Sequence, residues 1–323
     1  MRAAFCRAYG GPIEIADVPT PEPGPGQVRV TVEAAGVNFT DVLLVNNKYQ
    51  VSASLPFTPG SEFAGVVSAA GEGVDRLSPG DRVSGATLVG AFAQEIVVDA
   101  TSATLVPEGV ASRDAAAFGV AHATAYHALR SFARVQPGEW VVVLGAAGGV
   151  GLAAVALARV LGARVVAAAS SADKLEACRE QGADALVNYG AEDLKDRIKT
   201  LTGGGAHVVL DPVGGSFSEA ALRATRWGGR FVCLGFASGD IPRIPLNLIL
   251  LKGVILTAFE FRGFGLHAPD ELRRNNDELR ELLREGRIRP YVSAVFPLSE
   301  TAQALNLLAE RRSIGKILID PNG

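Results

Sequence analysis

The order of apolar and polar residues changes character about a third of the way along the chain. In the first part, short apolar runs are separated by turns, and residues 27–33 alternate apolar and polar positions as a half-buried strand does. The prolines and glycines of residues 19–26 exclude a helix directly before this strand. Further strand-like runs lie at residues 58–67 and 80–83. The pattern predicts a compact, β-rich first region.

The later part of the chain alternates buried strands with helices. After Ala111 the composition becomes alanine-rich, which predicts a helix with Ser112 as its N-cap. The strands predicted beyond it are residues 141–144, 164–168, 185–187, 208–211, 229–235, 254–257 and, near the end, 315–320. The helices predicted among them include residues 174–181, 278–283 and 301–311. This succession predicts a doubly wound parallel sheet.

A glycine-rich turn joins the first of these strands to its helix. The segment runs from Trp140 through Val141-Val-Val-Leu144 to Gly151, and it has the form of a buried strand, a tight turn and a helix start. Such a turn lets backbone N–H groups approach a dinucleotide pyrophosphate at the helix N-terminus. The alternative is a glycine-rich turn that binds nothing. The residues expected to contact the cofactor here are Ala146, Ala147, Gly148, Gly149 and Val150.

The end of the second strand distinguishes NADH from NADPH. An acid at this point would bond the adenine ribose and repel a 2′-phosphate, but the strand ends in alanine at position 169. Asp173 lies beyond the strand, where an acid in a first helical turn serves the helix dipole. Ser170, Ser171 and Lys174 instead offer hydroxyls and a positive charge. The sequence therefore favours NADPH.

Composition narrows the class of protein. The 323 residues are 48% hydrophobic and 20% charged with a net charge of -3, enough for two globular domains and without the basic excess that nucleic acid attracts. Three separated cysteines form no CxxC pair, so neither a zinc cluster nor a disulfide framework is expected, and a cytoplasmic location fits. No signal peptide is expected at the N-terminus. Residues 140–158 carry no charge, but their glycines and valines fit strand, turn and helix better than a membrane span.

Several motifs occur in an order that is typical of one enzyme family. They are Gly36-Val-Asn-Phe-Thr-Asp41, Pro59-Gly-Ser-Glu-Phe-Ala-Gly65, Gly71-Glu-Gly-Val74 with Gly80-Asp-Arg-Val83, Thr124-Ala-Tyr126, the glycine-rich turn, and Asp211-Pro-Val-Gly-Gly215. Over essentially its whole length the chain resembles the quinone oxidoreductase (zeta-crystallin-like) branch of the medium-chain dehydrogenase/reductase superfamily. The resemblance implies a GroES-like, β-rich catalytic domain at residues 1–121, a Rossmann NADP-binding domain at 122–257, and a return to the catalytic domain at 258–323.

One departure from the zinc-dependent alcohol dehydrogenases of this superfamily bears on the reaction. At their three zinc-ligand positions this chain has Asn38, Ser61 and, near the third, Val120, none of which supplies the thiolate or imidazole that tetrahedral zinc prefers. No metal is therefore expected. Without a Lewis acid, alcohol oxidation is disfavoured, and an acceptor that is already activated becomes the better candidate.

The resemblance also implies site residues. Four polar side chains are expected near the nicotinamide or the substrate, with Asn38 and Thr124 also contacting the cofactor: Asn38, Asp41, Tyr49 and Thr124. Each has an ordinary structural alternative. Asn38 and Asp41 could serve a turn or a helix cap, Tyr49 could be a half-buried aromatic residue, and the Thr124 hydroxyl could bond within its own helix. Tyr49 is a candidate proton donor, and solvent is the alternative because an unassisted phenol is a weak acid.

The resemblance implies further cofactor contacts, and several of these lie at the ends of the later strands, where open parallel sheets bind ligands. They are Tyr189, Val213, Leu234, Gly235, Phe236 and Phe259. Phe261 joins Phe259 as a candidate cover for the nicotinamide, and plain core or interface packing is the alternative for both. His122 and His127 have no thiolate nearby and are expected to pack within a helix.

The expected function is metal-independent reduction of quinones by hydride from NADPH. Hydride transfer to a quinone or a conjugated carbonyl gives a delocalised anion that needs only hydrogen-bond donors and a proton. An enone, enal or enoyl thioester is the alternative acceptor, and an NADPH-binding structural or regulatory protein is the alternative outside enzymes. The apolar run 254–259 is a candidate sheet edge for a homodimer.

Overall fold

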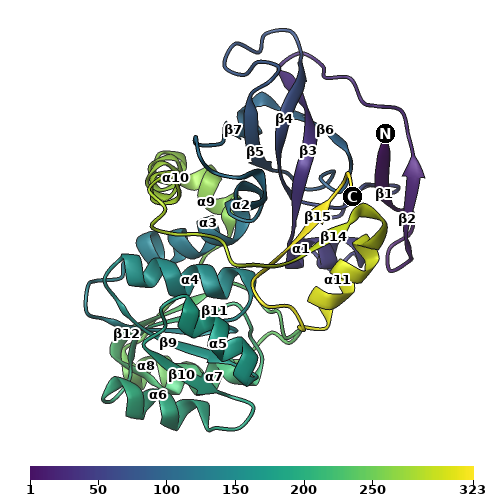
Figure 1. Ribbon diagram of the computed structural model, residues 1–323. Coiled ribbons are helices and arrows are strands. Elements are labelled where there is room, and N and C mark those ends of the chain that lie inside the picture. Colours follow the sequence, from purple (N-terminus) through teal and green to yellow (C-terminus); the bar gives the residue numbers. More distant parts are fainter. The chain divides into compact units, whose positions relative to one another are not determined.

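The protein divides into two compact units. The computed structural model describes all 323 residues, with residues 1–120 and 289–323 in unit 1 and residues 121–288 in unit 2 (Figure 1). The first division lies one residue from the predicted boundary at 121. The second lies at residue 289 and not at 258, so the predicted return to the catalytic domain is placed about thirty residues too early.

Unit 1 is built on an antiparallel sheet. The seven-stranded sheet has the order β14-β15-β3-β4-β5-β7, with β6 also paired to β3, and a separate hairpin is formed by β1 and β2. The strands are β1 (Arg2–Cys6), β2 (Ile13–Asp17), β3 (Gln27–Val37), β4 (Glu62–Ala70), β5 (Arg82–Ala86), β6 (Glu95–Asp99), β7 (Ala103–Leu105), β14 (Val292–Pro297) and β15 (Lys316–Asp320). The helices are α1 (Phe39–Val45), α2 (Ser112–Ala116) and α11 (Thr301–Ala309), with 3₁₀ turns η1 (Ala100–Ser102) and η3 (Leu298–Glu300).

Register places the C-terminal strand beside the first long strand of unit 1. Strand β3 alternates half-buried and buried residues over its first half, as its sequence predicts, and then becomes wholly buried from residue 34 to 37. In this buried half it pairs with β15, Ile317 lying opposite Val37, and with β4, Glu62 lying opposite Gly36. Three segments distant in sequence therefore meet at the end of β3.

Unit 2 is a parallel sheet with helices packed against it. Its six strands have the order β10-β9-β8-β11-β12-β13 and are all parallel, the 3-2-1-4-5-6 order of a Rossmann sheet. The strands are β8 (Trp140–Leu144), β9 (Arg164–Ala169), β10 (Ala185–Asn188), β11 (Ala206–Asp211), β12 (Thr225–Cys233) and β13 (Ile255–Ala258). The helices are α3 (Gly119–His127), a π-helical turn η2 (Ala128–Phe132), α4 (Gly149–Val160), α5 (Ala172–Glu180), α6 (Leu194–Thr202), α7 (Ser216–Arg223), α8 (Leu246–Lys252), α9 (Phe261–His267) and α10 (Pro269–Arg284).

Helices α9 and α10 explain the position of the second boundary. The Tyr126 hydroxyl donates to Glu278 at 2.7 Å, and the Asn275 amide donates to Ser131 at 2.8 Å, which binds α10 to the α3 and η2 segment of unit 2. These contacts join residues about 150 positions apart. A composition pattern along the chain carries no sign of them, so the sequence did not indicate that these helices belong to unit 2.

Two other details of the structure bear on the expectations. Ser112 is the first residue of α2 and Ala111 is its N-cap, so the predicted capping role of Ser112 is wrong; its hydroxyl donates to Glu33 instead. Every helix falls short of the length or the apolar character that a bilayer crossing requires.

Candidate active site

The glycine-rich turn between β8 and α4 is shaped to hold a ligand against backbone. Gly145 has φ +55°, and a Cβ on it would lie 2.7 Å from Val213 Cγ2, so only glycine fits without strain. A Cβ on Gly151 would lie 2.4 Å from the Gly145 carbonyl oxygen. Gly148 is the N-cap of α4, and its carbonyl accepts the Leu152 N–H at 2.9 Å. The N–H groups at the start of a twelve-residue helix thus lie beside a turn cleared of side chains, which fits a pyrophosphate.

The five residues predicted to contact the cofactor at this turn divide into two kinds. Ala146 and Ala147 are buried, so only their backbone is available, whereas Gly148, Gly149 and Val150 are half-exposed. The structure therefore brings all five to the same turn. Their binding role stays a prediction.

The end of β9 collects the groups that were expected to receive a 2′-phosphate. Lys174 Nζ lies 3.4 Å from Ser170 Oγ, and Ser171 is the N-cap of α5. Tyr189 follows β10, and its N–H donates to the carbonyl of Ala169, the last residue of β9. The Tyr189 ring packs on Phe217 with ring centroids 4.5 Å apart. Two hydroxyls, an ammonium and an aromatic ring therefore adjoin one strand end.

A buried carboxylate shapes the loops after β11 and β12. Asp211 Oδ1 accepts the N–H groups of Val213 at 2.8 Å and Gly214 at 2.9 Å, and its Oδ2 accepts the Ser218 hydroxyl at 2.5 Å. Both oxygens of the buried Asp211 carboxylate are thus occupied by residues that follow β11. Asp211 therefore stabilises the conformation of the loop after β11. From the sequence, only Val213 of this segment was expected to contact a ligand at the strand end. An aspartate followed by Pro-Val-Gly-Gly was a detectable turn signal.

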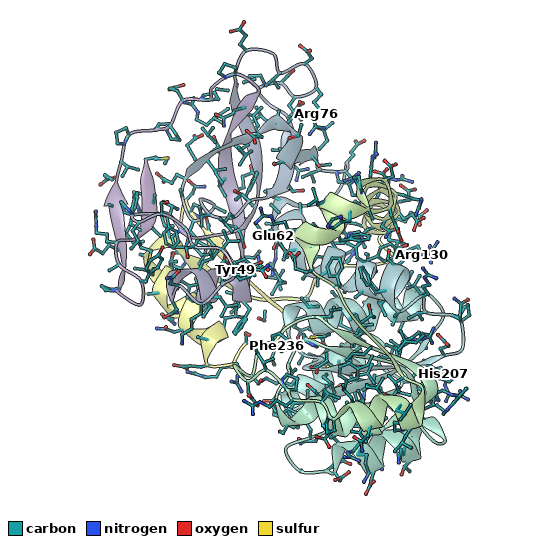
Figure 2. The ribbon with its side chains drawn as sticks, turned by 180° about the vertical axis from the view of Figure 1, so that it is seen from behind. Tyr49, Glu62, Arg76, Arg130, His207 and Phe236 are labelled. Atoms are coloured by element: carbon teal, nitrogen blue, oxygen red, sulfur yellow. The ribbon has the colours of Figure 1, made fainter.

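The same network fixes the other predicted strand-end residues. The Leu234 N–H donates to the Asp211 carbonyl at 2.8 Å, and the Ser238 N–H donates to the Val213 carbonyl at 2.8 Å. Gly235 and Phe236 lie between these two bonds, and Phe236 is partly exposed. Figure 2 shows Phe236 and His207 at opposite ends of unit 2. The loops after β11 and β12 are therefore one connected structure at the carboxyl end of the sheet.

Thr124 and the two candidate aromatic residues occupy different surroundings. Thr124 is the one half-exposed residue in the otherwise buried stretch 121–129. Phe259 is 5% exposed and packs on His127, with ring centroids 5.6 Å apart, whereas Phe261 remains 40% exposed. The packing of Phe259 matches its alternative as a core aromatic. Its contact with cofactor remains a prediction, and Phe261 is the more accessible of the two.

His127 is a core residue of unit 2. Its Nδ1 accepts from the Asn275 amide at 3.2 Å and its Nε2 donates to Asn276 Oδ1 at 3.2 Å, an arrangement that suits the neutral ring. Burial lowers its pKa to about 4, against a smaller opposing effect of the Asn276 bond. Nowhere in the chain do three His, Cys, Asp or Glu side chains converge as a metal-binding group.

A buried polar cluster occupies the end of β3 in unit 1. Lys316 Nζ donates to Glu62 Oε2 at 2.8 Å and to Asn38 Oδ1 at 2.7 Å. The Asn38 amide nitrogen donates in turn to Glu62 Oε2 at 3.2 Å and to Ser61 Oγ at 3.3 Å. The exposed fractions are 8% for Asn38, 6% for Ser61, 3% for Lys316, 1% for Glu62 and 0% for Asp41. These five residues are called the β3-end cluster below.

The cluster contains the positions at which the superfamily resemblance places zinc ligands. Asn38 and Ser61 belong to it, and the Val120 N–H donates to Glu62 Oε1 at 2.7 Å. The amide of Asn38 is engaged on both sides by neighbours within unit 1. The sequence alone did not predict Glu62 and Lys316 as site residues, although a lysine directly before the apolar run Ile317–Ile319 and a glutamate in the segment Pro59 to Gly65 were visible signals.

Asp41 is the member of this cluster that lies in the first turn of α1. Its Oδ2 accepts the Asn38 N–H at 2.7 Å across the first turn of the helix, and its Oδ1 has no hydrogen-bond partner. Burial raises the pKa of Asp41 to about 7, and the Asn38 N–H, the Ser61 hydroxyl and the Lys316 charge oppose that shift. Asp41 can therefore exchange a proton close to neutral pH.

Tyr49 lies in the loop that follows α1 and is not one of the five residues of the β3-end cluster. It is half-buried and packs against the apolar core of unit 1 (Figure 2, where Glu62 is also labelled). This packing agrees with its alternative as a half-buried aromatic. Its role as a proton donor stays a prediction.

Comparison with known proteins agrees with both units. Residues 24–108 match the alcohol dehydrogenase GroES-like domain, and residues 149–279 match the zinc-binding dehydrogenase family. The chain is 40% identical to quinone oxidoreductase-like protein 2 of Bos taurus over 98% of its length and 92% of that relative. It is 39% identical to a homolog of that protein in Nematostella vectensis, over 99% of its length and 88% of the relative.

The chain belongs to the quinone oxidoreductase branch of the medium-chain dehydrogenase/reductase superfamily.

A solved structure of this family agrees in fold. The quinone oxidoreductase of Escherichia coli, solved in complex with NADPH, superimposes with a TM-score of 0.92 at 30% identity and covers 99% of this chain and 100% of its own. The predicted combination of a GroES-like domain and a Rossmann sheet is thereby confirmed. The chain is an oxidoreductase of this superfamily.

Proposed function

We propose that this protein reduces quinones with NADPH and needs no metal ion. The observation that carries the proposal is the β3-end cluster, in which the positions of a superfamily zinc site hold an amide and a hydroxyl oriented by the Lys316–Glu62 ion pair. These groups are hydrogen-bonding groups and poor zinc ligands. Quinones suit such a site because the anion formed by hydride addition is delocalised and needs only donors and a proton.

Unit 2 supplies the residues that fit a dinucleotide. The turn of Gly148, Gly149 and Val150 would hold the pyrophosphate, and Ser170 with Lys174 would bind the 2′-phosphate. When bound, the reduced nicotinamide supplies the hydride. The backbone of the connected loops after β11 and β12 would line the cofactor site at the carboxyl end of the sheet. Thr124 would offer its hydroxyl near the nicotinamide.

A panel of acceptors tests the reaction. The consumption of NADPH and of NADH should be followed with benzoquinone, with an enone and with an enoyl thioester, in the presence and absence of a metal chelator. We expect turnover with the quinone, insensitivity to the chelator, and preference for NADPH. Turnover with only the enone or the thioester would identify the alternative acceptor class, and cofactor binding without consumption would indicate a structural or regulatory protein.

Lys174 and Ser170 allow the cofactor preference to be tested within unit 2. Lys174→Ala removes the ammonium at the end of β9, so the KM for NADPH should rise by about tenfold while the KM for NADH stays the same, as expected for the loss of roughly 1.4 kcal/mol. Lys195→Ala, in an exposed pair on α6, is the matched control. An equal effect on both cofactors would contradict the assignment.

We further propose a homodimer formed through strand β13. Strand β13 is an edge strand, because only β12 pairs with it. Ile255 and Leu256 on this strand are exposed, as are three other large apolar residues of unit 2, Trp227, Leu250 and Leu251. Pairing of two such edges would cover apolar surface that otherwise favours aggregation. Sedimentation should give twice the 33.6 kDa chain mass. Leu256→Lys should yield monomers, and a wild-type monomer at micromolar concentration would contradict the proposal.

We also propose that the protein works in the cytoplasm. Cys6, Cys178 and Cys233 are all free thiols, which suits a reducing compartment. Cell fractionation followed by detection of the native protein tests this placement.

A further inference from the structure

The Asp41 carboxyl is an ionisable group that the structure buries completely without a counterion of its own. The nearest ammonium, on Lys316, is already bonded to Glu62 and to Asn38. Asp41 Oδ2 accepts the Asn38 N–H at 2.7 Å, Oδ1 has no partner within hydrogen-bond distance, and Ser61 is the one side chain whose hydrogen bonding acts on the carboxyl. An ionised carboxylate in such a place is costly, whereas a protonated one is not. Burial therefore favours the protonated form of Asp41.

The groups that face Asp41 come from three elements. At the start of β4, the preceding residue Ser61 presents its hydroxyl, which favours the ionised form, and Glu62 presents its carboxylate, which disfavours it. Strand β15 presents Lys316, which favours the ionised form, and its own helix α1 contributes the N–H of the N-cap Asn38. The opposing effects leave the pKa of Asp41 at about 7. A group with such a pKa both holds and releases a proton at neutral pH.

The Ser61 hydroxyl is the side-chain donor next to the Asp41 carboxyl. Its oxygen accepts a hydrogen bond from the Asn38 amide at 3.3 Å, and Asn38 cannot turn its amide over because Lys316 holds Oδ1 at 2.7 Å. The Ser61 hydroxyl hydrogen must therefore point to a different acceptor. Ser61 is 6% exposed and Asp41 is 0% exposed, so the serine is the more accessible of the two.

We propose that the Asp41 carboxyl is the proton reservoir of the reaction and that the Ser61 hydroxyl hands the proton to the reduced acceptor. This inference rests on the proposed function, because it needs an acceptor that becomes an anion. When hydride has been added, the acceptor oxyanion takes the Ser61 hydroxyl proton, and the O–H bond of Asp41 breaks as its proton moves to Ser61 Oγ. Asp41 is left as a carboxylate and regains its proton from water. Each turnover consumes one hydride and one such proton, and no further oxidant or reductant is needed.

The direct test is Asp41→Asn, which keeps the shape of the side chain and an oxygen for the Asn38 N–H. The wild-type kcat should fall as pH rises through about 7, because only the protonated carboxyl donates. Loss of a general acid typically lowers the rate by about 10²- to 10⁴-fold, so the kcat of Asp41→Asn should fall by that factor and lose this pH dependence. The dissociation constant of NADPH should stay within about twofold of the wild-type value.

A matched control separates chemistry from helix or turn capping. Asp81 Oδ2 accepts the Ser78 N–H at 2.8 Å, the same bond across three residues that Asp41 makes to Asn38, but in a partly exposed turn. Asp81→Asn should leave kcat and its pH profile unchanged. Ser61→Ala should reproduce the loss of kcat, and Ser61→Thr, which restores a hydroxyl, should recover part of it.

Infrared spectroscopy gives a measurement that does not depend on turnover. Protein labelled with ¹³C-aspartate should show a protonated carboxyl band that disappears as pH rises through about 7 and that is absent in Asp41→Asn. If Asp41→Asn does not fold, this titration in the wild-type protein still decides the question, because absence of the band at pH ~6 overturns the proposal.

The outcomes distinguish this inference from the proposed function. If the wild-type protein binds NADPH but does not oxidise it when a quinone is present, the proposed function fails. If the wild type turns over a quinone but Asp41→Asn retains its kcat and pH profile, the reaction stands and the proton reservoir is refuted. A rate loss in Asp81→Asn equal to that in Asp41→Asn would show that capping alone explains the effect and would also refute it.

Discussion

Replacement of Lys316 by methionine tests how strongly the β3-end cluster holds unit 1 together. Lys316 and Glu62 are 3% and 1% exposed, and the ammonium donates to Glu62, to Asn38 and to the Val37 carbonyl. Methionine preserves most of the side-chain length but leaves the Glu62 carboxylate buried without a cation. Breaking a buried pair by removing one partner costs about 3–5 kcal/mol. The total stability of a protein is about 5–15 kcal/mol, so this loss is a large fraction of it.

The double variant isolates the ion pair. Glu62→Gln keeps an oxygen for the Val120 N–H, so Lys316→Met combined with Glu62→Gln leaves no unpaired charge. The double variant should be more stable than Lys316→Met alone, and the coupling energy of the cycle should be at least about 2 kcal/mol, within the usual range for residues in contact. Lys195→Met, in the exposed Lys195–Asp196 pair, is the control and should cost less than about 1 kcal/mol.

Urea unfolding followed by two probes gives these energies. Far-ultraviolet circular dichroism reports both units, whereas the tryptophans, Trp140 and Trp227, both lie in unit 2. The Lys316→Met variant should shift the dichroism transition to lower urea by the predicted energy divided by the m value. A cost for Lys316→Met as small as that of Lys195→Met, or additive single effects, would refute the view that this pair organises the cluster.

Three further predictions concern unit 2. Gly151→Ala places a Cβ 2.4 Å from the Gly145 carbonyl oxygen, so the free energy of unfolding should fall by about 1–3 kcal/mol. NADPH should bind at least tenfold more weakly in a fluorescence titration, and unchanged affinity would contradict the proposed role of the turn. Asp211→Ala leaves buried donors of the loop after β11 without an acceptor, so the free energy of unfolding measured by thermal unfolding should fall by at least about 2 kcal/mol. The KM for NADPH should also rise. A variant with unchanged stability and KM would show that the loop keeps its conformation without Asp211. His127 stays neutral in the folded protein down to about pH 4, whereas in the unfolded chain it is protonated below its ordinary pKa of 6.5. Between these pH values the unfolded state binds more protons than the folded state. The free energy of unfolding should therefore fall by up to about 3 kcal/mol between pH 6.5 and 4. His127→Gln should flatten this dependence in urea titrations at several pH values, and an unchanged slope would exclude His127 as its source.

Local sequence pattern predicted the parts of the fold that depend on neighbouring residues. The strand at 140–144, the turn at Gly145 to Gly151 and the polar groups of Ser170 and Lys174 are set within a few residues of one another, and the structure places them as expected. The helices at 261–284 were assigned to the wrong unit because their partners, such as His127, are about 150 residues away.

The candidate site shows the same division between local and distant causes. Asn38 and Asp41 belong to one short motif, and the capping bond between them follows from their spacing. The pairing of Lys316 with Glu62 depends on β15 lying beside β3, a contact between residues more than 250 positions apart. Only the three-dimensional register shows that Asn38 is engaged on both sides and that Asp41 is left without a counterion.

Transfer of hydride from C4 of NADPH to a quinone in a single turnover is the most direct test of the proposed function. The protein should be mixed in a stopped-flow instrument with benzoquinone and with NADPH carrying either hydrogen or deuterium at the transferred position of C4, in the presence of a metal chelator. We predict rapid loss of the reduced nicotinamide, a slower rate with the deuterated cofactor, and the same rates without chelator. The account would be contradicted if NADPH is bound but not consumed, or if the chelator abolishes the reaction and zinc restores it.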